Sequence, residues 1–142
     1  EKGFNILARL TKKFYQRSGV NSQTFRTNCP RIGDSARSSR KTDEGIIACG
    51  AIVEKFDTQP YGEIRRLYVK PSHRGKGLSR RIMQILLHQA GEKKIPLIRL
   101  ETGPKQIKSI NLYENVGFKR CSSFGSYIDN PQSVFMELGL SQ

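Results

Sequence analysis

The residues with the clearest chemical meaning form a basic, glycine-rich stretch in the middle of the chain. It reads Arg74-Gly75-Lys76-Gly77-Leu78 and lies between a strand-like segment and a helix-like one. The first amides of a helix have no partner inside the helix, and the helix dipole favours negative charge beside them. Glycine lets the chain bend tightly there and lets a phosphate approach closely. The stretch therefore predicts a phosphate-binding site.

Positive charge supports this prediction without identifying the ligand. The chain carries 25 Lys and Arg against 12 Asp and Glu, a formal net charge of +13, and much of it lies in residues 63–81. Such a field attracts the phosphates of a nucleotide cofactor and those of nucleic acid alike. The stretch lacks the Gly-Lys-Ser/Thr of a Walker motif and the third glycine of a dinucleotide fingerprint.

The surrounding segments indicate a mixed α/β domain with no internal repeat. Hydrophobic periodicity predicts strands at residues 46–55, 63–70, 95–101, 118–121 and 133–138. It predicts helices at residues 3–17, 78–92 and 107–115. The expected core stripe of the middle helix is Leu78, Ile82, Ile85, Leu86 and Ala90. Residues 57–62, with Pro60, are expected to form a turn, and residues 18–45 a long loop with room for one weak strand.

Two segments, in this order, resemble the GNAT acetyltransferase superfamily. Residues 63–69 (EIRRLYV), followed by the glycine-rich stretch and a helix, resemble its central motif, and residues 111–118 (NLYENVGF) resemble its second segment. The loop position that is usually Gln or Arg is Ser72 here. The resemblance covers residues 45–140 well and residues 1–44 weakly, and we expect a single domain over residues 1–142.

The resemblance implies the acyl-CoA N-acyltransferase fold. This is a mixed, mostly antiparallel sheet with splayed parallel central strands, flanked by helices. Acetyl-CoA would lie between the strands that end at Val69 and Glu101. Backbone groups of Leu67 and Val69 would pair with the pantetheine arm, and amides from Arg74 to Ser79 would hold the pyrophosphate. The cofactor-binding residues implied in this way are Leu67, Tyr68, Val69, Arg74, Gly75, Lys76, Gly77, Leu78, Ser79 and Tyr113.

Acetyl transfer to an amine needs a route for the amine proton, a polarised thioester carbonyl and a proton for the departing thiolate. The resemblance implies that Glu63 is the base, that the Leu67 amide polarises the carbonyl and that Tyr113 is the acid. Glu63 is interpreted equally well as an ion-pair partner of a neighbouring arginine, and a water chain is another route for the proton. Glu101 is a second candidate base, for which we favour a structural role. Phe124 and Tyr127 either line the acceptor pocket or cover the core.

Other functions stay open at this point. The main alternative is a basic module that binds nucleic acid or the ribosome without catalysis, although no helix-turn-helix, zinc finger or RNA-binding aromatic signature is visible. A family member that binds coenzyme A but is inactive is another. The sequence does not identify the amine acceptor, although the positive field disfavours polycations. A homodimer is also an open alternative.

Cysteine usage and hydropathy bear on the compartment. Cys29, Cys49 and Cys121 are widely spaced and odd in number, which indicates neither a zinc site nor a disulfide framework. No apolar run reaches membrane-spanning length, and no signal-peptide pattern begins the chain. We therefore expect reduced thiols in a cytoplasmic protein, with no metal and no membrane partner.

Overall fold

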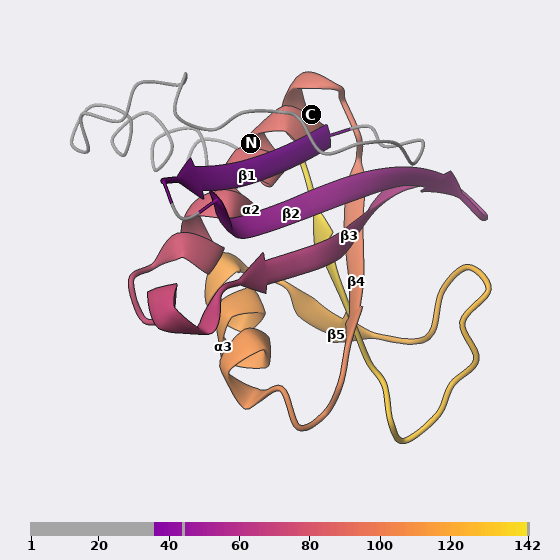
Figure 1. The fold of residues 1–142 in the computed structure, drawn as a ribbon. Coiled ribbons are helices and arrows are strands. Elements are labelled where there is room, and N and C mark those ends of the chain that lie inside the picture. The colour runs from indigo at the N-terminus through magenta and orange to yellow at the C-terminus, as the bar shows by residue number, and fades with distance from the viewer. Residues whose placement is uncertain (1–35, 44, 142) are drawn as a thin grey trace.

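The computed structural model describes residues 36–43 and 45–141, whose strands form one sheet. The strand order is β1-β2-β3-β4-β6-β5 (Figure 1). The strands are β1 (Ala36–Thr42), β2 (Gly45–Phe56), β3 (Pro60–Val69), β4 (Leu97–Thr102), β5 (Lys119–Cys121) and β6 (Val134–Gly139). The helices are α2 (Leu78–Glu92) and α3 (Ile107–Val116), with one 3-10 turn, η2 (Pro71–His73).

The central strands β3 and β4 are the one parallel pair in this sheet of described residues. Their paired residues are Gly62 with Ile98 and Glu63 with Arg99, near the start of each strand, whereas the other neighbours are antiparallel. Beyond Glu63 the two strands part. In Figure 1, β3 runs toward the turn before α2, whereas β4 turns away toward the segment before α3. The expected sheet with splayed parallel central strands is therefore confirmed.

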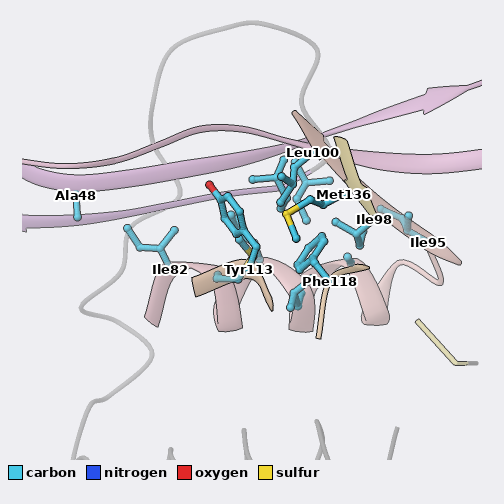
Figure 2. Packing of buried hydrophobic residues seen from close by; sticks show 14 of the residues in the cluster. Ala48, Ile82, Ile95, Ile98, Leu100, Tyr113, Phe118 and Met136 are labelled. Carbon is cyan, nitrogen blue, oxygen red and sulfur yellow. The ribbon is translucent and has the colours of Figure 1, made fainter. Parts of the chain in front are cut away.

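The main core lies between the sheet and both helices (Figure 2). Because α2 lies across β1, β2 and β3, its buried face differs from the expected stripe. Met83 and Leu87 are buried, whereas Ile85 is only partly so. Tyr113 of α3 and Phe118 belong to the same core. One core thus fixes the position of both helices against the central strands.

The opposite face of the sheet carries a smaller aromatic cluster. Tyr61, Phe124 and Phe135 are buried there. The ring centroid of Phe124 is 5.6 Å from that of Tyr61 and 5.7 Å from that of Phe135. Since successive strand residues point to opposite faces, Arg99 also belongs to this face. Its guanidinium lies 5.0 Å from the Tyr61 ring centroid and 2.7 Å from a carboxylate oxygen of Asp57. The loop over residues 122–133 is thereby held against the sheet.

Several predicted boundaries are wrong, each for a local reason. β3 starts at Pro60, where we expected a turn through residue 62, because a proline at the first strand position need not donate to the ladder. β4 starts at Leu97, since the amide of Ile95 donates to the carbonyl of Ala90 at 3.0 Å and completes the end of α2.

The N-terminal predictions are tested only in part. A strand over residues 36–42 occupies part of the expected long loop, because pairing with β2 along its length stabilises a polar segment. The helix expected at residues 3–17 lies outside the described residues. That residues 1–142 form one domain stays a prediction.

Gly50 of β2 lies directly against α2. An added Cβ would sit 2.7 Å from Cγ2 of Ile82 and 3.0 Å from Cδ1 of Leu86. Overfilling a closed core costs roughly 1–3 kcal/mol. We expect Gly50→Ala to lower the free energy of unfolding by that amount, measured by urea denaturation followed by circular dichroism.

Gly91→Ala in α2 is the matched control. A Cβ there meets nothing within 4 Å, and alanine is the better helix residue by roughly 0.5–1 kcal/mol. This variant should therefore be at least as stable as the wild type. Equal stability of the two variants would contradict the close contact between β2 and α2.

Candidate active site

β3 contains a β-bulge just beyond the point where it leaves β4. The register with β2 shifts between Cys49 and Ala51. Two residues of β3, Arg66 and Leu67, therefore lie opposite Gly50 alone. Arg66 has a φ of 54°, a left-handed conformation that costs a non-glycine residue about 1 kcal/mol or more. Bulges of this kind change the direction in which the following residues point.

The strand beyond the bulge presents a backbone edge to the gap. The amide of Lys70 donates to the carbonyl of Ile47 on β2 at 2.7 Å. Alternate residues of an antiparallel strand direct their backbone groups to opposite sides, so those of Val69 and Leu67 point away from β2. Accordingly, Nε of Arg74 donates to the carbonyl of Val69 at 3.0 Å from that other side. The edge faces the space that opened when β3 and β4 parted.

The glycine-rich turn leads directly into the start of α2. Gly75 and Gly77 both have a φ of 75°, and a Cβ at either position meets nothing within 4 Å. Glycine is needed there for backbone conformation rather than for space. No side chain of the described residues caps α2, and its first backbone bond runs from Arg81 to Gly77. The amides of residues 78–80 therefore precede the first helical bond and can bind an anion.

A cleft of about 840 Å³ joins these features. Its walls come from β3, the glycine-rich turn, the start of α2, the end of β4 and one face of α3. Nine of the ten residues expected to bind the cofactor line it, namely Leu67, Tyr68, Val69, Arg74, Gly75, Gly77, Leu78, Ser79 and Tyr113. Lys76 is exposed and lies outside the lining. The structure thus brings the predicted cofactor residues together in one cavity.

Charge in this cleft is strongly one-sided. In the wall that the structure describes, the basic side chains are Arg65, Arg66, Arg74, Arg80 and Lys108. The acidic side chain in the same wall is Glu101. A cleft with this balance concentrates anions from solution.

Tyr113 of α3 reaches the cleft from the core side. It is 7% exposed, and its ring lies edge-on to Phe118 with centroids 5.9 Å apart. Figure 2 shows its hydroxyl oxygen pointing toward the strands. Burial raises the pKa of Tyr113, so the phenol stays protonated at neutral pH and can donate a hydrogen bond into the cleft.

Glu63 lies on the other face of the sheet and is 1% exposed. Its carboxylate oxygens are 2.6 Å from Nζ of Lys55, 2.6 Å from the hydroxyl of Tyr127 and 3.2 Å from Nε of Arg65. Burial raises the pKa of Glu63, but these three donors outweigh burial and lower it below 4.5. The ion pair with a neighbouring arginine is therefore present. Glu63 is not part of the cleft lining, although Ile64 and Arg65 are.

We call the place where β3 and β4 part, beyond Glu63 and Arg99, the fork. Several polar residues near it were not singled out from the sequence as site residues. Lys55 could have been found from the β2–β3 hairpin, which places it diagonally across from Glu63. Ser133, whose hydroxyl donates to Oε1 of Glu101 at 2.9 Å, had no such local signal. Of the two aromatics in the loop, Phe124 is buried in the cluster, and Tyr127 bonds to Glu63.

Other candidate chemistry is sparse in the part of the chain that the structure describes. No group of three or more His, Cys, Asp and Glu side chains there could hold a metal ion. Among the described residues Cys49 and Cys121 form no disulfide, and Sγ of Cys49 lies 3.6 Å from the carbonyl oxygen of Arg66. None of the described helices combines the length and the apolar character that a membrane crossing requires.

The chain resembles known acetyltransferases in sequence. The model of the Acetyltransferase (GNAT) family matches residues 6–118. An IAA acetyltransferase of Azospirillum brasilense is 38% identical over 93 residues, which make up 65% of this chain and 60% of that protein. The match therefore spans less than two thirds of the relative's own length.

Solved structures share the fold. A protein from Klebsiella pneumoniae, assigned to the acyl-CoA N-acyltransferases, superposes with a TM-score of 0.68 and 29% identity, covering 96% of this chain and 88% of that one. A GNAT family acetyltransferase from Elizabethkingia anophelis, solved with acetyl-CoA bound, gives a TM-score of 0.60 at 16% identity. It covers 73% of this chain and 75% of that one. At that identity the second likeness concerns the fold alone.

The environment of Glu63 predicts a pH-dependent contribution to stability. Because its pKa is lower in the folded state than its ordinary value of 4.5, its contribution is complete above that value and is lost as the pH falls through the folded pKa. Glu63→Gln should cost roughly 1–3 kcal/mol at neutral pH, and the difference from the wild type should shrink as the pH falls below 4.5. Urea denaturation across this range measures it.

Glu54→Gln on β2 is the control, because Glu54 is about half exposed and should change stability by no more than about 0.5 kcal/mol. A difference between Glu63→Gln and the wild type that stays constant with pH would show that ionisation of Glu63 does not stabilise the fold.

Proposed function

The chain belongs to the GNAT acetyltransferase family, and from this premise we propose that it transfers an acetyl group from acetyl-CoA to a primary amine. The observation that carries the proposal is the cleft that joins an uncapped helix start to the open edge of β3. Two parts of coenzyme A match these two features, namely its diphosphate and its extended, amide-containing pantetheine arm. The acetyl-CoA bound to the protein of the same fold from Elizabethkingia anophelis supports the choice of cofactor.

The cofactor would bind mainly to backbone groups. The pyrophosphate would accept hydrogen bonds from amides between Arg74 and Ser79, which Gly75 and Gly77 leave accessible. The pantetheine arm would pair with Leu67 and Val69 in the manner of an added strand. Nearby cationic side chains would neutralise the phosphates, among them Lys76, which is exposed beside the turn.

The acetyl transfer would proceed by direct attack of the amine on the thioester. The ammonium form of the acceptor first gives up one proton, for which a water chain is the proposed route. The neutral nitrogen then forms a bond to the carbonyl carbon, the carbon–sulfur bond breaks, and the nitrogen gives up a second proton by the same route. The Leu67 amide, directed by the bulge at Arg66, would hold the carbonyl oxygen as negative charge develops on it. Tyr113 would donate its proton to the thiolate that leaves.

Glu63 was the first candidate for the base, with an ion-pair role as an equal alternative, and its surroundings argue for the latter. Three donors already bind its carboxylate, and a lowered pKa makes it a weak proton acceptor. We propose that it positions Arg65 and Tyr127 at the edge of the cleft. A positioning role would make Glu63→Gln change KM more than kcat, whereas loss of the base would lower kcat.

Binding of acetyl-CoA should stabilise the fold. At about 100 times its dissociation constant the cofactor should add about 2.7 kcal/mol to the free energy of unfolding. In Gly77→Ala this increment should shrink, because a left-handed φ disfavours alanine and distorts the turn. Urea denaturation with and without ligand measures the increment and cancels any loss of basal stability.

Gly139→Ala is the matched control, since Gly139 lies outside the cleft and its Cβ would meet nothing within 4 Å. An unchanged increment in Gly77→Ala would remove the turn from the binding site. No increment in the wild type, together with salt-dependent binding of RNA, would favour the nucleic-acid alternative.

Tyr113→Phe should lower kcat by about 10²–10⁴-fold, the usual effect of losing a general acid. The variant should still be stabilised by acetyl-CoA, which would show that the loss is in the chemical step and not in binding. Turnover by the wild type in the same assay would distinguish an active enzyme from an inactive protein that only binds coenzyme A. Tyr61→Phe, at a buried tyrosine outside the cleft, is the control. Turnover that is unchanged in Tyr113→Phe would exclude the acid role.

A further inference from the structure

We propose that the acceptor is an amino acid, an amine that also carries a carboxylate, and that Arg65 and Glu101 bind its two charges on opposite sides of the fork between β3 and β4. This inference rests on the proposed function, because it identifies the acceptor of that same reaction. The observation behind it is that two side chains of opposite charge, Arg65 and Glu101, line the same cleft and are each oriented by a bond to a neighbouring side chain.

Arg65 provides the positive side. It lies in β3 two residues beyond Glu63, where pairing with β4 ends, and it lines the cleft. Its side chain is 45% exposed, and its Nε is 3.2 Å from the buried carboxylate of Glu63. A guanidinium has five N–H donors in one plane, so a bond through Nε leaves capacity for a second carboxylate. Glu63 thus orients a cation that remains accessible from the cleft.

Glu101 provides the negative side. It lies in β4 two residues beyond Arg99, the partner of Glu63, so its place in β4 corresponds to that of Arg65 in β3. It lines the same cleft, and the hydroxyl of Ser133 donates to its Oε1 at 2.9 Å. An ionised carboxylate has about four lone-pair sites. One hydrogen bond therefore fixes its orientation and leaves capacity for an ammonium group.

Tyr127 lies close to both charges. Its hydroxyl donates to Oε1 of Glu63 at 2.6 Å. Its pKa is raised to about 12, first by burial and then by Glu63, with smaller effects of opposite sign from Glu101 and Arg65. The loop over residues 122–133 therefore meets β3 and β4 at one place. The loop contacts both strands through Tyr127 and Ser133, although none of its residues lines the cleft itself.

The charge of Arg65 is not needed for the cofactor phosphates. Arg65 and Val69 lie opposite Ala51 and Ala48 of β2, which are three residues or about 10 Å apart along the strand. The turn assigned to the pyrophosphate lies beyond Val69. The reacting carbonyl is assigned to Leu67, close to Arg65. A cation at that end suits an anionic group on the acceptor. A polyamine would be repelled by the basic wall, and a protein amino terminus has a peptide bond in place of the α-carboxylate.

The test compares each amino acid with its carboxamide, which keeps the amine and loses the negative charge. Acetyl transfer is followed by release of the coenzyme A thiol, with the standard amino acids, β-alanine and γ-aminobutyrate as acceptors. For the best acceptor we expect kcat/KM to exceed that of its carboxamide by roughly 10–100-fold, the usual value of a hydrogen bond to a charged group.

Variants separate the two charges. Arg65→Gln should lower kcat/KM for the amino acid to the level of the carboxamide and leave the carboxamide almost unchanged. Glu101→Gln should lower kcat/KM for both acceptors, since both carry the amine. Arg120→Gln, at an exposed arginine outside the cleft, should keep the wild-type preference. Stabilisation by acetyl-CoA, retained in Arg65→Gln, shows that the variant is folded and binds its cofactor.

Two results would overturn the inference, and they are distinguishable. If carboxamides, diamines or peptide amino termini react as well as any amino acid, the proposed function stands and the acceptor class is wrong. If acetyl-CoA neither stabilises the protein nor is consumed with any amine, the proposed function fails and the inference fails with it.

Discussion

The early end of the pairing between β3 and β4 is the constraint on which the site depends. Two neighbouring strands normally satisfy each other's backbone groups, and buried groups without a partner are costly. Here the ladder stops after Glu63 and Arg99, and the bulge at Arg66 then directs Leu67 and Val69 toward the resulting gap. A ligand that supplies the missing partners gains binding energy from the backbone itself.

The fork is stable because its vertex is held on both faces of the sheet. On one face, Glu63 binds three donors, and Arg99 binds Asp57 beneath aromatic rings. On the other face, Ile64 and Ile98 are part of the main core with α2 and α3. The same helices deliver the uncapped amides and Tyr113 to the gap. The packing of α2 and α3 against the sheet thus also determines the geometry of the site.

The sequence predicted the parts of the site that depend on local signals. A positive φ at Gly75 and Gly77 follows from glycine between a strand and a helix. Nine of the ten residues predicted to bind the cofactor line one cleft. Contacts between residues far apart in the sequence could not be predicted from it. No residue spacing predicts that Tyr127 bonds to Glu63, a residue 64 positions away. The burial of Met83 in place of Ile85 depends on which strands α2 crosses.

Hydrogen exchange at Leu67 and Val69 tests the central claim most directly. If the open edge of β3 binds the pantetheine arm, saturating acetyl-CoA should slow amide exchange at one or both of these residues, as happens when a strand gains a partner. Ala51, already within the β2–β3 ladder, should change little. Exchange at Leu67 and Val69 that stays unchanged while acetyl-CoA is bound would contradict the account.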